Sequence, residues 1–328
     1  MSILRIGLGV GVGAAFLVLL FRHVDFATVN AILGRALIWP LLLALLAYAA
    51  DFVLRAVRFW VMLLAITGRP LPLKPSISPF IASFGISDIL PLRAGDGFRI
   101  IWFNRQFGIP AGTLIGAMLV ERVLDLVSIL ALGGIALALV GVSAPSVLVT
   151  NFQLVLGLTL FVCLAILFAP TLLSRLLERL TFRGAATPVA AVLGALRSTS
   201  AAVQHMGNWR RLALLTAFSL ACWLLESIVL LCAWFSLGGS VSEIMKAFLA
   251  FVFSTLGTLV PSLPGHFGSF EYFGVQAFTL TGVDPSFATA VVLLAHLLLW
   301  APTAIFGVVW LLMGSARSPV HAPAPLQP

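Results

Sequence analysis

The sequence predicts an all-α protein: a polytopic helix bundle that crosses a membrane several times. Of its 328 residues, 61% are hydrophobic and only 9% are charged, and the mean hydropathy is +1.14. A water-exposed surface of ordinary composition cannot cover so apolar a chain, so lipid must be its main solvent. The apolar residues also fall into long runs, two of which are broken by proline and glycine. The length of these runs and their interruptions predict the individual elements.

The long apolar runs predict about six full spans. A helix needs about 20 apolar residues to cross the hydrocarbon core of a bilayer. Runs of that order occur at 3–21, 37–66, 112–140, 147–168, 211–236 and 285–313. The first run follows Arg5 and resembles either a signal peptide or a membrane helix. No small-x-small cleavage site follows it at 22–26, so we expect an uncleaved helix.

Two shorter apolar runs predict re-entrant units. The stretches 76–90 and 247–260 hold only about 15 residues each, which is too few for a comfortable span. Each ends at a cluster of proline and glycine, at Pro91–Gly97 and at Pro261–Gly268. Broken segments at corresponding positions of two halves are typical of transporter binding sites. We therefore predict re-entrant units at about 76–108 and 247–282, related as an inverted repeat.

The distribution of arginine predicts the orientation. Segment 170–211 holds six arginines, so the positive-inside rule places it on the cytoplasmic side of the membrane. We expect this membrane to be the inner membrane. The uncharged loop 141–146 then lies outside. A re-entrant first unit keeps Arg5, Arg69 and Lys74 on the cytoplasmic side as well. We expect a single transmembrane domain over 1–314, with an amphipathic cytoplasmic segment at about 171–208 and a disordered tail at 315–328 that contains four prolines.

Composition and motifs argue against several function classes. The net charge of +8 fits basic cytoplasmic loops near anionic lipid, and no nucleic-acid motif accompanies it. The cysteines and histidines lack metal-ligand spacing, and there is no phosphate-binding GxxxxGK loop. We therefore expect no metal, no cofactor and no nucleotide-driven step, and we expect a transporter rather than an enzyme.

Charged residues inside a predicted span are the first candidates for a site, because such residues are costly in lipid and usually face a cavity or a partner. Glu121 and Asp125 share one helical face, and Arg122 lies beside Asp125. They predict either a site for a cationic or zwitterionic group, a proton relay, or a structural ion pair that ties the first re-entrant unit to this helix, with Arg99 or Arg93 neutralising the second carboxylate. Glu226 is a second candidate for a functional carboxylate. His296 is expected to be a hydrogen-bonded packing residue.

Two further sets of charges need separate interpretations. In the span 37–66, we expect Asp51 to pair with Arg55 and Arg58 to extend to the interface. At the first proline–glycine cluster, the charged residues surround glycines whose unwound backbone would expose amides to an anion. These residues are Arg93, Gly95, Asp96, Gly97 and Arg99. The alternative is a glycine-rich turn with solvated charges.

The second broken unit offers a loop and a carboxylate. Gly265 lies in the loop that follows Pro264, and Glu271 stands where a half-helix would begin. A carboxylate is favoured at the positive end of a helix, so Glu271 has a structural explanation as well as a functional one.

Three motifs in order resemble the transmembrane region of the lysylphosphatidylglycerol synthase family. They are Leu90–Arg99, Glu121–Asp125, and Pro261–Gly265 with Gly268 and Glu271. The resemblance covers about 1–314. It implies an integral membrane protein of flippase-like type that binds or moves a lipid, and some stand-alone members are associated with hopanoid lipids. Two departures limit the inference: Asp96 replaces a frequent glutamate, and we expect no C-terminal synthase domain. The synthase activity is therefore not expected.

The sequence thus predicts a lipid flippase-like transporter of the inner membrane, with a membrane lipid as its partner. The expected lipid-binding residues are Arg93, Gly95, Asp96, Arg99, Glu121, Arg122, Asp125, Glu226, Gly265 and Glu271. Two alternatives from other classes stay open. One is a membrane-embedded enzyme of lipid or hopanoid biosynthesis that uses Glu121 or Asp125 as a general base. The other is a scaffold for lipid-biosynthesis enzymes that docks them on 171–208.

Overall fold

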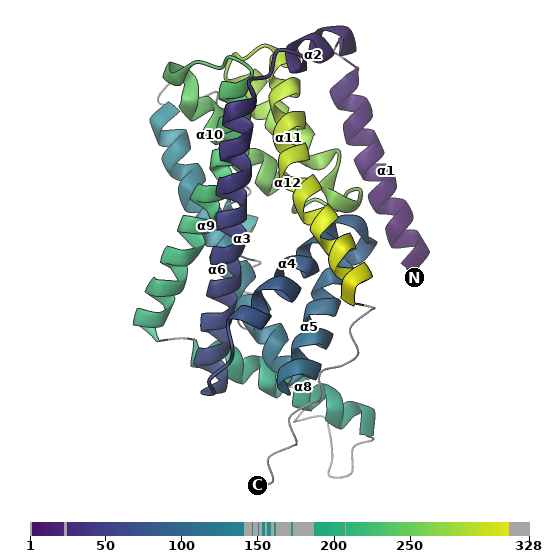
Figure 1. Cartoon of the computed structure of the whole chain (residues 1–328), viewed down its shortest axis with the longest axis vertical. Coiled ribbons are helices and arrows are strands. Elements are labelled where there is room, and N and C mark those ends of the chain that lie inside the picture. The colour runs from purple at the N-terminus through teal and green to yellow at the C-terminus, as the bar shows by residue number, and fades with distance from the viewer. Residues whose placement is uncertain are drawn as a thin grey trace.

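The computed structural model describes residues 2–22, 25–140, 187–206 and 208–314, with isolated residues between 146 and 172. Within these residues the chain is all-α, as predicted (Figure 1). Four helices are long and apolar enough to cross a membrane: α3 (Ile38–Thr67), α6 (Ala111–Val140), α9 (Trp209–Ser236) and α12 (Pro285–Gly314). The predicted span at 147–168 and the tail at 315–328 lie largely or wholly outside the described residues.

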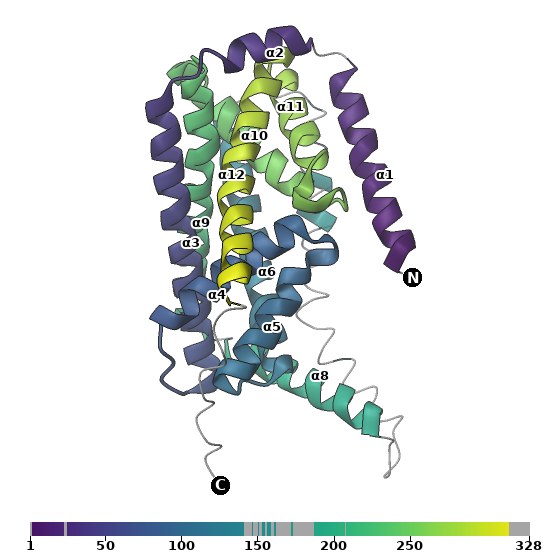
Figure 2. The same ribbon diagram turned by 45° about the vertical axis from the view of Figure 1, so that its right-hand side comes forward.

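The first predicted span forms α1 (Ser2–Phe21), which packs against the outside of the bundle. This helix has 20 residues and is therefore shorter than the four long helices. The chain then turns into the short helix α2 (Phe26–Leu33), which lies across the upper end of the bundle (Figure 2). Asp25 caps α2 by accepting hydrogen bonds from the backbone amides of Ala27 and Thr28. The Asp25 carboxylate is exposed. The hydrogen bonds that it accepts, chiefly the one from the Thr28 hydroxyl, stabilise its charged form and lower its pKa.

The two broken stretches each form a helical hairpin. The first consists of α4 (Lys74–Ile89), the 3-10 turn η1 (Pro91–Arg93) and α5 (Ala94–Phe107); we call it the lower hairpin. The second consists of α10 (Ile244–Gly257), the turn η3 (Pro264–His266) and α11 (Ser269–Leu280); we call it the upper hairpin. They enter from opposite ends, and α4 contacts η3 near the middle of the bundle (Figures 1 and 2).

The apolar core is divided between the hairpins. One buried cluster joins the upper hairpin to α9 and α12, with Phe251, Phe278 and Trp234 at its centre. The other joins the lower hairpin to α3 and α6, with Phe59, Phe80 and others. Each hairpin therefore carries its own packed core, and the polar residues of the interior gather around the place where the tips meet.

Glycine allows the lower hairpin to approach α12 closely. An ideal Cβ built on Gly85 of α4 would lie 1.9 Å from the carbonyl oxygen of Thr303, and Gly307 of α12 faces the same contact. Gly95 is similarly close to α4, because a Cβ there would lie 1.7 Å from the carbonyl oxygen of Ser83. Small residues at such contacts are how membrane helices bring their backbones together.

The last described part of the predicted amphipathic segment is α8 (Thr187–His205), at the lower end of the molecule (Figure 1). Its C-terminal half packs on the start of α6 through small residues: Gly112 faces Ala195 and Ser198, and Gly116 faces Ala202. Residues 173–186 lie outside the described part of the chain.

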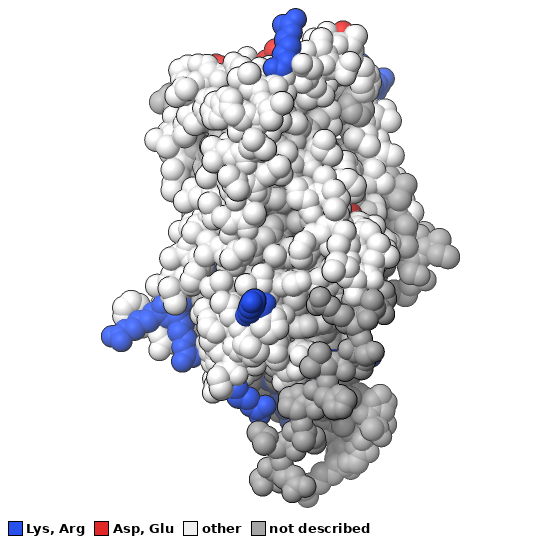
Figure 3. Space-filling model, in the orientation of Figure 1, with Lys and Arg blue, Asp and Glu red and all other residues white. Residues whose placement is uncertain are grey.

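Most surface charges lie toward the two ends of the bundle, and the wide band between them is almost entirely without charge in this view, apart from one small acidic spot (Figure 3). Lysine and arginine mark the lower end, whereas both signs occur at the upper end. Exposed leucine, isoleucine and valine side chains cover the long helices between these ends. The distribution is that of a multi-pass membrane protein.

Candidate functional site: a charged cavity between two hairpin tips

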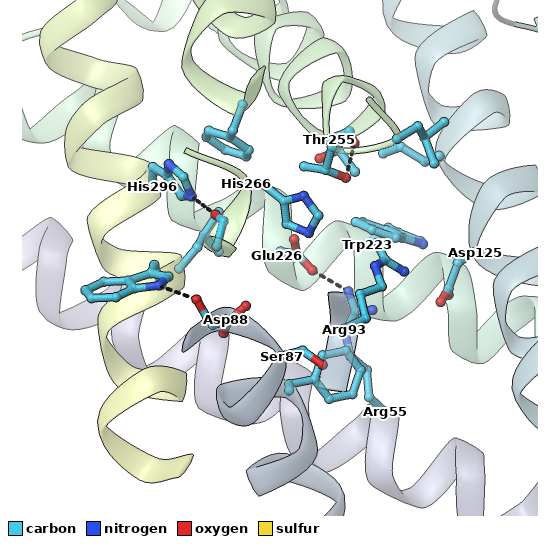
Figure 4. A pocket seen from close by; sticks show the side chains of 18 of the residues that line it. Arg55, Ser87, Asp88, Arg93, Asp125, Trp223, Glu226, Thr255, His266 and His296 are labelled. Atoms are coloured by element: carbon cyan, nitrogen blue, oxygen red, sulfur yellow. Dashed lines mark hydrogen bonds and ion pairs between the residues drawn. The ribbon is translucent and has the colours of Figure 1, made fainter. Parts of the chain in front are cut away.

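A cavity of about 240 Å³ lies where the two hairpins meet. Side chains from α3, α4, α6, α9, α12 and both turns line it, as Figure 4 shows for the labelled residues. The lining combines charged groups with aromatic and aliphatic ones such as Tyr48, Phe84, Leu126, Trp223 and Leu259. A site of this composition suits a ligand that has both a polar and an apolar part.

Of the predicted site residues, six line the cavity: Arg93, Asp96, Arg122, Asp125, Glu226 and Gly265. The remaining four do not. Gly95 is buried in the contact between α4 and α5, and Arg99, Glu121 and Glu271 are each about 1% exposed behind the lining. The ten predicted residues therefore lie in or next to the cavity. The sequence did not distinguish those that face the cavity from those that support its walls.

Arg58 holds the two carboxylates of α6. Its guanidinium donates to Asp125, to Glu121 at 3.0 Å and to the Ser219 hydroxyl at 2.6 Å. The side chain is fully buried, so the prediction that Arg58 reaches the interface was wrong. The physical reason is that two carboxylates one helical turn apart on α6 give a buried guanidinium a bidentate partner.

Arg99 supports the same carboxylates from the lower hairpin. It donates to Glu121 at 3.0 Å and to the Ser83 hydroxyl at 3.0 Å. The aromatic rings of Phe59, Phe80 and Phe84 surround its guanidinium carbon at 4.4–5.2 Å. A buried arginine in such a cage is satisfied within the protein, so Arg99 ties the lower hairpin to α6 rather than facing a ligand.

A second buried pair joins α3 to α9. Arg55 donates from Nε to Asp51 at 2.8 Å, as predicted, and from Nη2 to Glu226. Trp223 of α9 lies beneath the same guanidinium, with its ring centroid 4.7 Å away. Glu226 is therefore not isolated in its helix: it forms one side of the cavity while it is paired with Arg55.

The charges at the lower hairpin tip are arranged differently from the prediction. The backbone does not unwind at Gly95 and Gly97, which lie in the first turn of α5. It departs from helical geometry at Arg93, whose φ of 52° is left-handed. Such a conformation is uncommon for a residue with a side chain and is found at functional or strained positions. Its effect here is to place Arg93 at the cavity.

Arg93 is the cation that stays available. Its side chain is exposed to the cavity, and it forms no hydrogen bond or ion pair with any residue that the structure describes. Arg122 also faces the cavity, where its only described partner is Asp96, at 3.4 Å. An exposed guanidinium among apolar walls is a natural partner for a phosphate or carboxylate.

The upper hairpin contributes a turn and a buried carboxylate. Gly265 has φ of +71°, and a side chain there would collide with Trp300, whose nitrogen would lie 2.7 Å from its Cβ. Glu271 caps α11, as predicted, by accepting from the Gly268 amide at 2.7 Å. It also contacts His296, which is a buried, hydrogen-bonded residue, as expected.

Sequence reasoning missed Asp88 and His266, both of which line the cavity. Asp88 is the last charged residue of α4 and accepts a hydrogen bond from the Thr303 hydroxyl at 2.7 Å. The available signal was an acidic residue inside a short apolar run, one turn before Pro91. His266 lies in the Pro261–Gly268 cluster, of which only Gly265 was predicted to bind lipid.

The described residues include no group of three or more histidine, cysteine or acidic side chains that could hold a metal ion. Most charged groups of the cavity are instead arranged as pairs between helices, and Arg93 has no such partner among the described residues.

Fold and site together define a multi-pass α-helical membrane protein with two opposed hairpins and a charged cavity between their tips. The sequence profile of the lysylphosphatidylglycerol synthase transmembrane region matches residues 6–307. The chain therefore belongs to that family, as its motifs indicated. No curated protein matches the chain.

Proposed function

We propose that the chain binds a polar lipid by its head group in the central cavity and moves it between the two leaflets of the membrane. The observation that carries this proposal is the position of Arg93 at the tip of the lower hairpin, without an ion-pair partner among the described residues, in a cavity that also has apolar walls. The head group would occupy the polar part of the cavity, while the acyl chains stay near the apolar lining and the bilayer.

The pairing of the charges favours an anionic head group. The carboxylates Glu121, Asp125 and Glu271 all have partners inside the protein, so none is free for a cationic lipid. Arg93 is free, and Arg122 is held by one long contact. A phosphate would therefore gain a charge-assisted hydrogen bond from Arg93 without breaking a buried pair. The family's description names a derivative of phosphatidylglycerol, which makes phosphatidylglycerol the first probe.

The opposed hairpins supply a route to each leaflet. In this mechanism both hairpins are re-entrant, and each tip closes the cavity toward one side of the membrane. Alternate loosening of the two tips would expose the head-group site first to one leaflet and then to the other. Arg93 of η1 lines the cavity, and so do Gly265 and His266 of η3. Movement of either tip therefore changes access to Arg93.

The orientation follows from the charges at the ends. The lower end carries Arg69, Lys74, Arg105, Arg197, Arg210 and Arg211, and no described acidic residue lies there. The upper end carries cations and acids of about equal number. The positive-inside rule then places the lower end in the cytoplasm. An inner-membrane location and an association with hopanoid lipids stay predictions.

The same pairing weakens the enzymatic alternative. A general base must be free to take a proton from its substrate, whereas Glu121 and Asp125 are locked by Arg58 and Arg99. Binding and movement of a lipid need no such group.

Reconstituted vesicles test the proposal. Phosphatidylglycerol with a fluorescent acyl chain is placed in vesicles of phosphatidylglycerol and phosphatidylethanolamine, and a membrane-impermeant quencher reports its arrival in the outer leaflet. We expect the wild type to move the probe, Arg93→Ala to lose this movement, and Arg105→Ala, at the exposed end of α5, to retain it. Equal rates for wild type and protein-free vesicles, or for wild type and Arg93→Ala, would overturn the proposal.

A further inference from the structure

A buried carboxylate and imidazole hold the tip of the upper hairpin against α12. Glu271 is 1% exposed and His296 is 5% exposed. His296 Nδ1 lies 2.5 Å from Glu271 Oε1, and Nε2 lies 2.9 Å from the carbonyl oxygen of Gly265. The other carboxylate oxygen of Glu271 accepts from the Gly268 amide. Gly265 within η3 and Gly268 at the start of α11 are thus both tied to this pair.

The hydrogen bonds fix the number of protons in the pair. A carbonyl oxygen only accepts, so Nε2 of His296 must carry a proton. Nδ1 lies within hydrogen-bond distance of the carboxylate oxygen, so a second proton, on Nδ1 or on the carboxyl group, completes that contact. That proton resides on His296, as an imidazolium facing a carboxylate, or on Glu271, as a carboxylic acid facing a neutral ring. In both cases the pair is neutral overall and holds one proton more than a neutral histidine beside an ionised glutamate.

We infer that Glu271 and His296 form a binding site for a transferable proton, and that release of this proton loosens the upper hairpin tip. This inference rests on the proposed function, because it assigns the proton as the ion coupled to lipid movement. Without the proton, the neutral ring has one N–H for two acceptors, so either the Glu271 carboxylate or the Gly265 carbonyl faces a lone pair, and the pair gains a net negative charge away from water. The contact then opens, and α12 no longer holds the turn.

The surroundings suit a proton site that communicates with the cavity. The rings of Phe267 and Phe270 lie over the imidazole, each with its centroid 4.5 Å away, which shields the pair from water. His296 nevertheless lines the cavity, so the proton has a path to water or to a bound head group.

The titratable and charged groups that share this cavity come from every neighbouring element: Tyr48 and Arg55 of α3, Asp88 of α4, Arg93 of η1, Asp96 of α5, Arg122 and Asp125 of α6, Glu226 of α9 and His266 of η3. Asp88 and His266 lie next to the tip and affect the pH at which the proton leaves. Arg93 is the group through which an anionic head group would act on the same equilibrium.

Two variants should fix the tip in opposite states. In Glu271→Gln, the amide nitrogen donates to Nδ1 of a neutral His296 and the amide oxygen still accepts from Gly268, so the contact needs no extra proton. In His296→Ala, the contact to the turn is lost. His205→Gln is the matched control, because His205 is exposed on α8 and its ring bonds only the carbonyl oxygen of Ala201 in the same helix.

The first test needs no lipid movement. Nitrogen NMR of histidine-labelled protein counts the protons on His296, and the infrared carbonyl band of a protonated carboxyl group counts the proton on Glu271. Hydrogen exchange of segment 261–268, compared between variants at the same pH, reports opening of the tip. We expect the extra proton wherever 261–268 is protected, and we expect its removal by alkali to speed the exchange of 261–268. Glu271→Gln should stay protected before and after the addition of alkali and His296→Ala unprotected, while His205→Gln follows the wild type. An ionised Glu271 beside a neutral His296 while 261–268 stays protected would overturn the inference.

The vesicle assay separates this inference from the proposed function. We expect an imposed pH gradient to change the rate of movement of the fluorescent phosphatidylglycerol, and Glu271→Gln to lose that response. Movement that ignores the gradient in the wild type refutes proton coupling and leaves lipid movement standing. No movement in the wild type refutes the proposed function, and the proton count and hydrogen exchange then still decide whether the pair is a proton-dependent latch.

Discussion

His296 and Thr303 lie seven positions apart on one face of α12, and each contacts a carboxylate from a different hairpin. His296 contacts Glu271 of the upper hairpin, and the Thr303 hydroxyl donates to Asp88 of the lower hairpin. Between them, the indole nitrogen of Trp300 donates to the backbone oxygen of Asp88. Because residues at i, i+4 and i+7 share a helical face, α12 is the element to which both tips are attached.

The bond from Thr303 is the first target for mutation. Thr303→Val keeps the shape of the side chain but leaves Asp88 without this donor, which should cost about 1–3 kcal/mol of stability. We expect faster hydrogen exchange at the end of α4 and in η1. Thr289→Val is the control, because Thr289 is also buried in α12 but bonds only its own helix. Equal exchange in the two variants would show that Thr303 does not hold the lower tip.

Removing Arg58 should destabilise the whole bundle. Arg58→Ala leaves Glu121 with Arg99 alone and Asp125 without its guanidinium, and breaking a buried ion pair in this way costs about 3–5 kcal/mol. The measurement is thermal unfolding in mild detergent. Arg105→Ala, at an exposed position, should unfold close to the wild-type temperature. A stable Arg58→Ala protein would mean that the two carboxylates find another partner.

Two glycines of the lower hairpin should respond oppositely to alanine. Gly85→Ala places a methyl group 1.9 Å from a backbone oxygen of α12, so the helices must separate, at a cost of about 1–3 kcal/mol or more. Gly97 lies in α5 with nothing within 4 Å of its Cβ position, and Gly97→Ala should stabilise the protein by up to about 1 kcal/mol. Unfolding midpoints of both variants in the same detergent give the comparison. A Gly85→Ala midpoint at or above that of the wild type would contradict the close contact.

Binding should depend on Arg93 even when movement is not measured. A charge-assisted hydrogen bond contributes about 1.5–3 kcal/mol, so Arg93→Ala should weaken phosphatidylglycerol binding by about tenfold to a hundredfold. Native mass spectrometry with phosphatidylglycerol titrated against phosphatidylcholine measures the preference. Arg105→Ala controls for the loss of one positive charge. If both variants bind as tightly as the wild type, the phosphate does not rest on Arg93.

The helical class, the two broken units and the capping carboxylate Glu271 were predictable, because each has a local signal: run length, proline–glycine clusters and a helix start. The partners of the charges were predictable within a helix, as for Asp51 and Arg55, and between neighbouring segments, as for Arg99 and Glu121. Pairs such as Arg58 with Glu121, or Glu226 with Arg55, join residues that are far apart in sequence. Only the packing of α3, α6 and α9 determines them, and for that reason Arg58 was expected at the interface and Glu226 was expected to be alone.

The cavity lining depended on the same long-range packing. Arg93 and Arg99 lie in one motif, six positions apart, yet one faces the cavity and the other is enclosed by phenylalanine rings. The left-handed backbone at Arg93 produces this difference, and no composition or spacing rule indicates such a conformation at an arginine.

The bond between Arg55 and Glu226 joins residues 171 positions apart, which has a consequence for how the protein is made. During synthesis α3 enters the membrane with Asp51, Arg55 and Arg58 near its middle, and each such charge disfavours insertion by about 2.5–3.5 kcal/mol. Asp51 is the only one of their partners available at that moment. The ribosome must add α6 before Arg58 is neutralised and α9 before Arg55 meets Glu226. We therefore expect α3 to stay with the insertion machinery, or with a helper protein, until α9 has emerged, and a chain truncated before α9 to be degraded.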